Sequence, residues 1–326
     1  MMPESGHGGA TALDRKVTAC GQNGGMLVLL TGSSGRLGRA LAAALAPAHQ
    51  VIGLDRLPGP CTQVVADLED RAAIAAALAG VQAVLHTAAL HAPHVGQAAD
   101  DEFWRVNVRA TRQLAELAAE RGVQRFVYTS TTALYGAGQA AGAAGPAEWV
   151  DEWTVPRPRT VYHHSKLAAE AELQQVAAAR GLALSLLRMG RCFPEPAPVM
   201  ALHRLHRGVG LHDVARAHAL ALQHSTPGVR CLVLSGRTPF LRRDLQALGH
   251  DAPAVLRLRA PGLVAAFQAR GWPLPRRLDR VYAAHRAAAV LGWQAEEGFE
   301  AVLQALDRAA PDVLPPPAPR AESCPC

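Results

Sequence analysis

The chain lacks the features that would assign it to a membrane, to a disulfide-rich secreted fold or to nucleic acid. It has no run of roughly 18 apolar residues, and its opening stretch MMPESGHGGATALDRK has no apolar signal core. Its 6 cysteines are scattered, without the paired CxxC spacing of a metal site. Its charges, which sum to +6, form no block of one sign. We therefore expect no membrane, metal or nucleic-acid partner, and free thiols in a reducing cytoplasm.

The chain does have enough apolar material for a sizeable core. Its 326 residues are 49% hydrophobic and 18% charged, which excludes disorder as the dominant state. Residues 1–25 are rich in glycine and polar residues, and residues 311–326 are rich in proline. We expect a disordered leader and a disordered tail there. Met26, directly before the first apolar run, is an alternative to Met1 as the translation start.

Short apolar runs alternate with helical patterns through much of the chain. Runs that are apolar throughout are typical of strands covered on both faces. The expected strands are 26–31, 51–55, 83–86, 125–130 and 182–188, and the expected helices are 37–45, 70–78, 102–121 and 161–180. This alternation predicts right-handed βαβ units, and hence an α/β fold with a doubly wound parallel sheet of the Rossmann type.

A glycine-rich segment, TGSSGRLG at 31–38, follows the first expected strand and opens the first helix. Gly32 permits the tight turn, Gly35 lets the backbone approach a pyrophosphate, and Gly38 lets helix and strand pack closely. Free N–H groups at the helix N-terminus favour those phosphates. The cofactor-binding residues predicted in this segment are Gly32, Ser34, Gly35, Arg36, Leu37 and Gly38. The alternative is a glycine-rich turn without a ligand.

An acidic residue, Asp55, ends the second expected strand. A carboxylate there accepts hydrogen bonds from the adenosine ribose and repels a 2′-phosphate, which favours NAD over NADP. Arg36 and Arg56 could hold a phosphate instead, so NADP is not excluded. We expect residues 26–188 to form the dinucleotide-binding domain, with parts of 210–236 in its core. Residues 189–310, whose pattern is irregular and Pro-rich, form mainly a small C-terminal substrate lobe in this prediction.

The segment Tyr162-His163-His164-Ser165-Lys166 begins the longest expected helix, and its Tyr and Lys lie on one helical face. A phenol with a pKa of about 10 is a poor base at neutral pH. A nearby ammonium, with a bound nicotinamide cation, would lower that pKa. Thr131 ends a neighbouring strand, at the sheet edge where α/β sites form. By itself the YxxxK pattern fits a surface helix turn equally well.

Taken together, these motifs resemble the extended short-chain dehydrogenase/reductase superfamily, in its NAD-dependent epimerase/dehydratase group. The likeness covers about 26–308 and also rests on HTAA at 86–89, STTALYG at 130–136 and LGW at 291–293. It implies that Tyr162 is the catalytic acid/base, that Lys166 holds the nicotinamide ribose and that Thr131 orients the substrate hydroxyl. It also implies cofactor contacts from Asp67, Leu68, Ala88, Tyr162 and Lys166, and structural roles for Asn107 and Asp213.

The activity that the resemblance implies is hydride transfer at a secondary alcohol or ketone of a sugar or related small molecule. A dehydrogenase or an epimerase fits better than a dehydratase, because Thr132 and Ala133 stand where the sugar-nucleotide dehydratases carry an Asp-Glu pair. The resemblance also implies a homodimer through the helices at 102–121 and 161–180. The alternative from another class is a catalytically silent NAD(P)-binding regulator or scaffold.

Two groups of residues keep open roles at this stage. Four arginines could bind an anionic sugar derivative or could be solvated surface charges: Arg188, Arg191, Arg204 and Arg207. Trp149 and Trp153 precede Tyr162 and could form a wall of the site or serve packing.

Overall fold

A parallel sheet of seven strands forms the centre of the molecule, in the order β3-β2-β1-β4-β5-β7-β8. The computed structural model describes residues 25–136 and 145–316. The strands are β1 (Leu27–Thr31), β2 (Gln50–Asp55), β3 (Val64–Val65), β4 (Ala83–His86), β5 (Arg125–Thr131), β7 (Ala183–Met189) and β8 (Gly228–Leu234). The α/β fold and the doubly wound sheet that the sequence predicts are confirmed, and β8 returns to the sheet from the expected stretch 210–236.

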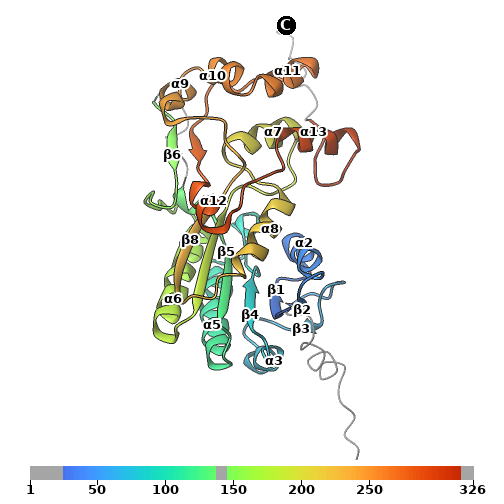
Figure 1. Cartoon of the computed structure of the whole chain (residues 1–326), viewed down its shortest axis with the longest axis vertical. Coiled ribbons are helices and arrows are strands. Elements are labelled where there is room, and N and C mark those ends of the chain that lie inside the picture. Colours follow the sequence, from blue (N-terminus) through green and yellow to red (C-terminus); the bar gives the residue numbers. More distant parts are fainter. Residues whose placement is uncertain (1–24, 137–144, 317–326) are drawn as a thin grey trace, which may run out of the picture.

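Helices cover both faces of this sheet (Figure 1). One face carries α3 (Arg71–Ala77), α5 (Ala110–Glu120) and α6 (Val161–Arg180), and the other carries α2 (Arg36–Leu45), α8 (Leu211–Ala221) and α12 (His285–Leu291). Successive strand residues point to opposite faces. Leu27 and Leu29 of β1 therefore pack in the first core, and Val28 and Leu30 pack in the second. This double burial explains why the strands are apolar throughout.

The helix expected over 102–121 is interrupted. It consists of α4 (Asp100–Trp104), a π-helical turn (Arg105–Arg109) and α5. The fully buried Asn107 lies in that turn and donates from Nδ2 to the Leu90 carbonyl (2.9 Å) and to Ser165 Oγ (3.0 Å). Its Oδ1 accepts from the Leu90 N–H at 2.8 Å. The wider turn thus places one amide between the segment after β4 and the start of α6.

A smaller lobe lies beyond the carboxyl ends of the strands (Figure 1). It contains a two-stranded parallel sheet of β6 (Glu148–Val150) and β9 (Arg280–Tyr282). Its helices are α7 (Ala197–His206), α9 (Leu245–Leu248), α10 (Ala252–Arg259), α11 (Pro261–Ala269) and α13 (Phe299–Asp307). The lobe has a hydrophobic core of its own, in which Phe240, Phe267 and Val281 are buried. No helix of the described residues is long and apolar enough to cross a membrane.

The sequence analysis places the start of the disordered tail, at Pro311, too early in the chain. Val313 is buried, and Leu314 pairs with Pro196 in a parallel bridge. Asp312 forms an ion pair with Arg36 at 2.8 Å. Apolar and charged contacts to the folded part therefore hold residues 311–316 despite their prolines. The expected leader, apart from residue 25, and the rest of the expected tail lie outside the described residues.

Candidate active site

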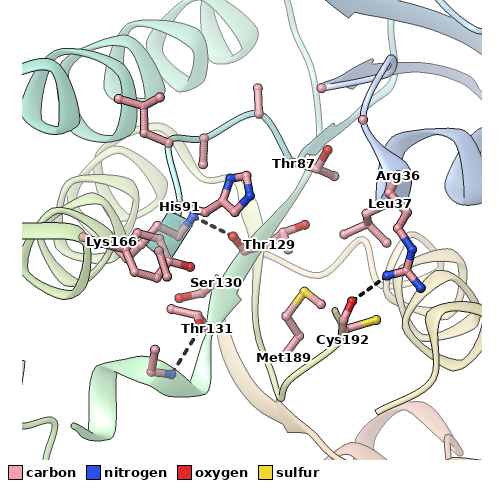
Figure 2. Close-up of a pocket in the computed structure, with 18 of the residues that line it drawn as sticks. Arg36, Leu37, Thr87, His91, Thr129, Ser130, Thr131, Lys166, Met189 and Cys192 are labelled. Atoms are coloured by element: carbon pink, nitrogen blue, oxygen red, sulfur yellow. Dashed lines mark hydrogen bonds between the residues drawn. The ribbon is translucent and has the colours of Figure 1, made fainter. Parts of the chain in front are cut away.

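A cavity of about 740 Å³ lies at the carboxyl end of the sheet. The segments that follow β1, β2, β4, β5 and β7 line it, together with the start of α6. Figure 2 shows part of this lining, with Thr129 and Lys166 facing Leu37 and Cys192. It brings together every predicted site residue except Ser34: Gly32, Gly35, Arg36, Leu37, Gly38, Asp55, Asp67, Leu68, Ala88, Thr131, Tyr162 and Lys166. Residues separated by more than a hundred positions therefore share one hollow, because parallel strands end at the same edge.

The glycine loop at 31–38 leaves room for a ligand beside the sheet. The backbone N–H groups that open α2 can then donate to that ligand. Gly32 has φ of 74°, which a side chain would disfavour. A Cβ at Gly38 would lie 2.0 Å from the Gly32 carbonyl oxygen, so helix and strand approach as closely as expected. Gly35 is the N-cap of α2, and no side chain of the described residues caps that helix. The first amides of α2 therefore suit an anion such as a pyrophosphate.

Ser34 faces the loop after β2 instead of the cavity. Its Oγ donates to the Leu57 carbonyl at 2.7 Å and lies 2.7 Å from Thr62 Oγ1. Its backbone N–H donates to Asp55 Oδ2 at 3.0 Å, while the Leu57 N–H donates to Asp55 Oδ1 at 3.0 Å. The backbone of Ser34 thus helps to fix the carboxylate of Asp55, and Ser34, predicted as a cofactor-binding residue, does not line the cavity itself.

Arg36 lines the cavity and is held by two partners. Its NH1 donates to the Cys192 carbonyl at 2.6 Å (Figure 2). Its Nε pairs with Asp312 at 2.8 Å. The guanidinium therefore connects the start of α2 both to the segment after β7 and to the C-terminal segment.

Tyr162 enters the cavity from the first turn of α6. Thr160 caps this helix by accepting from the His163 N–H at 3.3 Å. The Tyr162 phenol is buried, and Tyr162 and Thr131 line the same cavity. Burial raises the pKa of Tyr162 to about 12, and the Thr131 side chain offsets only part of that rise. This rise is opposite to the lowering of the Tyr162 pKa that we expect when a nicotinamide cation is bound beside the phenol.

Lys166 follows Tyr162 by one turn of α6, and its side chain lies against the end of β5. Its Nζ donates to the Thr129 carbonyl at 2.7 Å and stands 3.9 Å from the centre of the Tyr128 ring. Burial lowers the pKa of Lys166 to about 7, and the nearby Glu170 carboxylate opposes this shift. Lys166 therefore titrates close to neutral pH.

The four candidate arginines separate into two pairs. Arg188 is buried in an ion pair with Glu170 (2.6 Å) and also donates to the Tyr135 hydroxyl, and Arg204 is buried away from the cavity. Neither is a surface charge, and neither lines the cavity. Arg191 and Arg207 do line the cavity. Arg191 pairs with Glu195 at 2.5 Å, and Arg207 lies 3.5 Å from Asp279, its one ion pair among the described residues.

Several residues at the cavity were missed by the sequence analysis. These are His91, His94, Phe193 and Tyr282. The first two directly extend the HTAA motif, and reading that segment onward to residue 94 would have found them. By contrast, Trp149 and Trp153 line a separate hollow with Arg242 and His285, so they do not form a wall of this site.

Comparison with known proteins finds relatives in both sequence and fold. The model of the NAD dependent epimerase/dehydratase family matches residues 28–196. A 3-beta-hydroxysteroid dehydrogenase from Mycolicibacterium neoaurum is 36% identical over 34% of this chain and 34% of its own length. An NAD-dependent glucose-6-phosphate dehydrogenase from Haloferax volcanii is 32% identical over 44% of this chain and 60% of its own. The chain thus spans between a third and three fifths of these curated relatives.

Among solved structures, a UDP-glucose-4-epimerase from Stenotrophomonas maltophila with bound NAD and formylated UDP-arabinopyranose is similar in fold. The TM-score is 0.61, with 22% identity, and the likeness covers 87% of this chain and 100% of that one. It therefore includes both the sheet and the smaller lobe.

Proposed function

The chain belongs to the NAD-dependent epimerase/dehydratase family, and we propose that it interconverts a secondary alcohol and a ketone at Tyr162. Enzymes of this family use NAD. The observation that carries the proposal is that the buried Tyr162, Thr131 and Lys166 line the same cavity as the glycine loop, with Lys166 one helical turn from Tyr162. A phenol so placed can exchange a proton with a substrate hydroxyl held at Thr131.

The residues present fit the dinucleotide. The uncapped amides of α2 and the close glycine packing would hold the pyrophosphate, and Asp55 would hold the adenosine ribose. Asp67 and Leu68 would border the adenine, and Ala88 and Lys166 the nicotinamide end. When bound, NAD supplies the group that accepts or returns a hydride.

Proton transfer is the work of the chain's own residues. In oxidation, the ionised Oη of Tyr162 takes the proton of the substrate hydroxyl and becomes the neutral phenol, while Thr131 orients that hydroxyl. In reduction the phenol returns the proton and becomes the phenolate. With a pKa of about 12, the phenol needs positive charge nearby before it serves as a base at neutral pH. The Lys166 ammonium is the charge that the chain provides for this purpose.

The proposed substrate is a sugar or a related small molecule. Arg207 is half-buried, lines the cavity and lies 3.5 Å from its ion-pair partner Asp279. Its guanidinium supports the proposal that the substrate carries an anionic group. We also propose a homodimer through α5 and α6, supported by the resemblance of the chain to its family. A reducing cytoplasm suits the thiols of Cys61, Cys192 and Cys231, which are free in the described residues.

The test is the substitution Tyr162→Phe, which keeps the ring and removes the hydroxyl. Sugar acids, sugar phosphates, nucleotide sugars and hydroxyketones are screened by NADH absorbance, with product analysis to detect epimerisation. Turnover should fall by about 10²- to 10⁴-fold while NAD affinity stays within a factor of about two. If the variant keeps its activity, the assignment of Tyr162 is wrong. If the wild type binds NAD and turns over no substrate, a silent regulator is the better account.

A further inference from the structure

His91 is a polar residue of the cavity to which the proposed chemistry gives no role. It follows β4, whose His86 pairs with Tyr128 of the neighbouring strand β5. The two strands are parallel, so the segment after β4 faces the end of β5 that carries Thr129 and Thr131. Figure 2 shows His91 directed into the cavity near Lys166 and Thr129.

The imidazole of His91 is held in place on several sides. The Phe193 ring lies nearly parallel to it, with centroids 6.0 Å apart and planes 10° apart. The His94 ring meets it edge-on at 4.4 Å, and the backbone N–H of His91 donates to His94 Nδ1 at 3.0 Å. The orientation of the His91 ring is therefore set before a ligand arrives, as a positioning residue requires.

The hydrogen-bonding capacity of this ring follows from its protonation. Burial, with smaller contributions from His94 and from the Lys166 charge, lowers the pKa of His91 below 6.5, so the ring is neutral at pH 7. A neutral imidazole has one N–H and one bare nitrogen. No side chain of the described residues hydrogen-bonds to the His91 ring, which is half-buried at the cavity. The ring can therefore offer a hydrogen bond to a ligand.

Building on the proposed function, we infer that His91 positions the substrate by hydrogen-bonding to a second hydroxyl, on a carbon next to the reacting carbinol. A hydroxyl both donates and accepts, so it can pair with either nitrogen of the neutral ring, whereas a carboxylate or a phosphate dianion can pair only with the N–H. The site therefore selects polyhydroxylated substrates over alcohols with one isolated hydroxyl, such as a 3β-hydroxysteroid.

The experiment pairs a substitution with a matching change in the substrate. His91→Phe keeps a flat ring against Phe193 and deletes both nitrogens, and His91→Gln keeps an acceptor. Glucose 6-phosphate, L-arabinose, glucuronic acid and a 3β-hydroxysteroid are assayed by NADH formation. Each oxidised polyol is also assayed as its deoxy analogue at the carbon next to the oxidised one. Melting temperatures and NAD affinities are measured for all variants.

At least one polyol should be oxidised, and the steroid should not. His91→Phe should lower kcat/KM for that polyol about tenfold, mainly through KM, and the deoxy analogue should lose about tenfold with the wild type. Combining both changes should cost no more than either alone, because both remove the same hydrogen bond. His91→Gln should recover part of the loss.

Additive losses, a fall in NAD affinity in His91→Phe, oxidation of the steroid, or turnover of none of the polyols would each overturn the inference. A loss of NAD affinity would make His91 a cofactor contact. These outcomes are separable from a failure of the proposed function, because that function fails only if Tyr162→Phe remains active or no substrate of any class is converted.

Discussion

At the residue scale, the site depends on two buried groups whose ordinary titration is shifted in opposite directions. Burial raises the pKa of Tyr162 to about 12 and lowers the pKa of Lys166 to about 7. Both shifts favour the neutral forms. A bound cofactor cation would favour the phenolate, so the pair is poised for proton transfer once the site is filled. The chain has only two lysines among its 33 basic residues, Lys16 and Lys166.

That composition offers a matched control. Lys166→Met removes the ammonium but keeps a flexible side chain against Tyr128, and it should lower kcat by about 10²-fold or more because the phenolate loses its partner charge. Lys16→Met changes the other lysine and should leave kcat unchanged. Steady-state rates of the two variants decide the matter. Equal rates in both would remove Lys166 from the proposed mechanism.

The sequence predicted the residues whose role depends on their immediate neighbours in the chain. It did not predict the side-chain positions that depend on a partner from another segment. Gly32, Gly38 and Asp55 could be read from a strand, a turn and a helix in succession. The side chain of Ser34 turns away because Thr62, in a loop far along the chain, offers it a partner. Arg188 is buried because Glu170 on α6 neutralises it. Such partners lie beyond the range of a motif.

At the element scale, the π-helical turn is the feature that the sequence pattern hides. Apolar spacing continues from α4 into α5, so a periodic analysis sees one helix. The extra residue of this wider turn directs Asn107 towards Leu90 and Ser165. Asn107 thereby connects Leu90, which lines the cavity, to α6. Likewise β6 and β9 are 3 residues long, too short to leave a periodic signal.

Asn107→Ala should show what this turn contributes. It leaves the N–H and C=O of Leu90 without their partner, at an expected cost of about 1–3 kcal/mol in the free energy of unfolding. NAD affinity should also fall, because Leu90 lines the cavity. Urea denaturation and NAD titration measure the two effects. A variant as stable as the wild type would show that the turn does not need Asn107.

At the scale of the whole molecule, three fully buried histidines tie the fold to pH. Burial lowers the pKa of His86 and His206 to about 3 and that of His218 to about 4. The unfolded chain binds protons on these rings below pH 6.5, and the folded chain does not. The free energy of unfolding therefore falls as pH drops from about 6.5 towards 4, by up to about 1.4 kcal/mol per pH unit for each ring.

His218→Gln should make the free energy of unfolding less dependent on pH, because the unfolded chain then binds one proton fewer. Glutamine can still hydrogen-bond Thr129 Oγ1, which lies 2.8 Å from His218 Nε2, but it does not titrate. Free energies of unfolding, measured from pH 7 down to pH 4.5, give the slope. A slope equal to that of the wild type would mean that His218 is not held neutral by the folded chain.

The central claim is that the Tyr162 phenol becomes a base only when positive charge fills the site beside it, and its ionisation can be observed directly. Ultraviolet difference titration of tyrosinate, with and without NAD⁺ and with Tyr162→Phe as the blank, reports that pKa without any substrate. The account predicts a value near 12 for the free protein and a clearly lower one with NAD⁺, by about two units or more. An unchanged pKa on NAD⁺ binding, or the same shift in Tyr162→Phe, would contradict it.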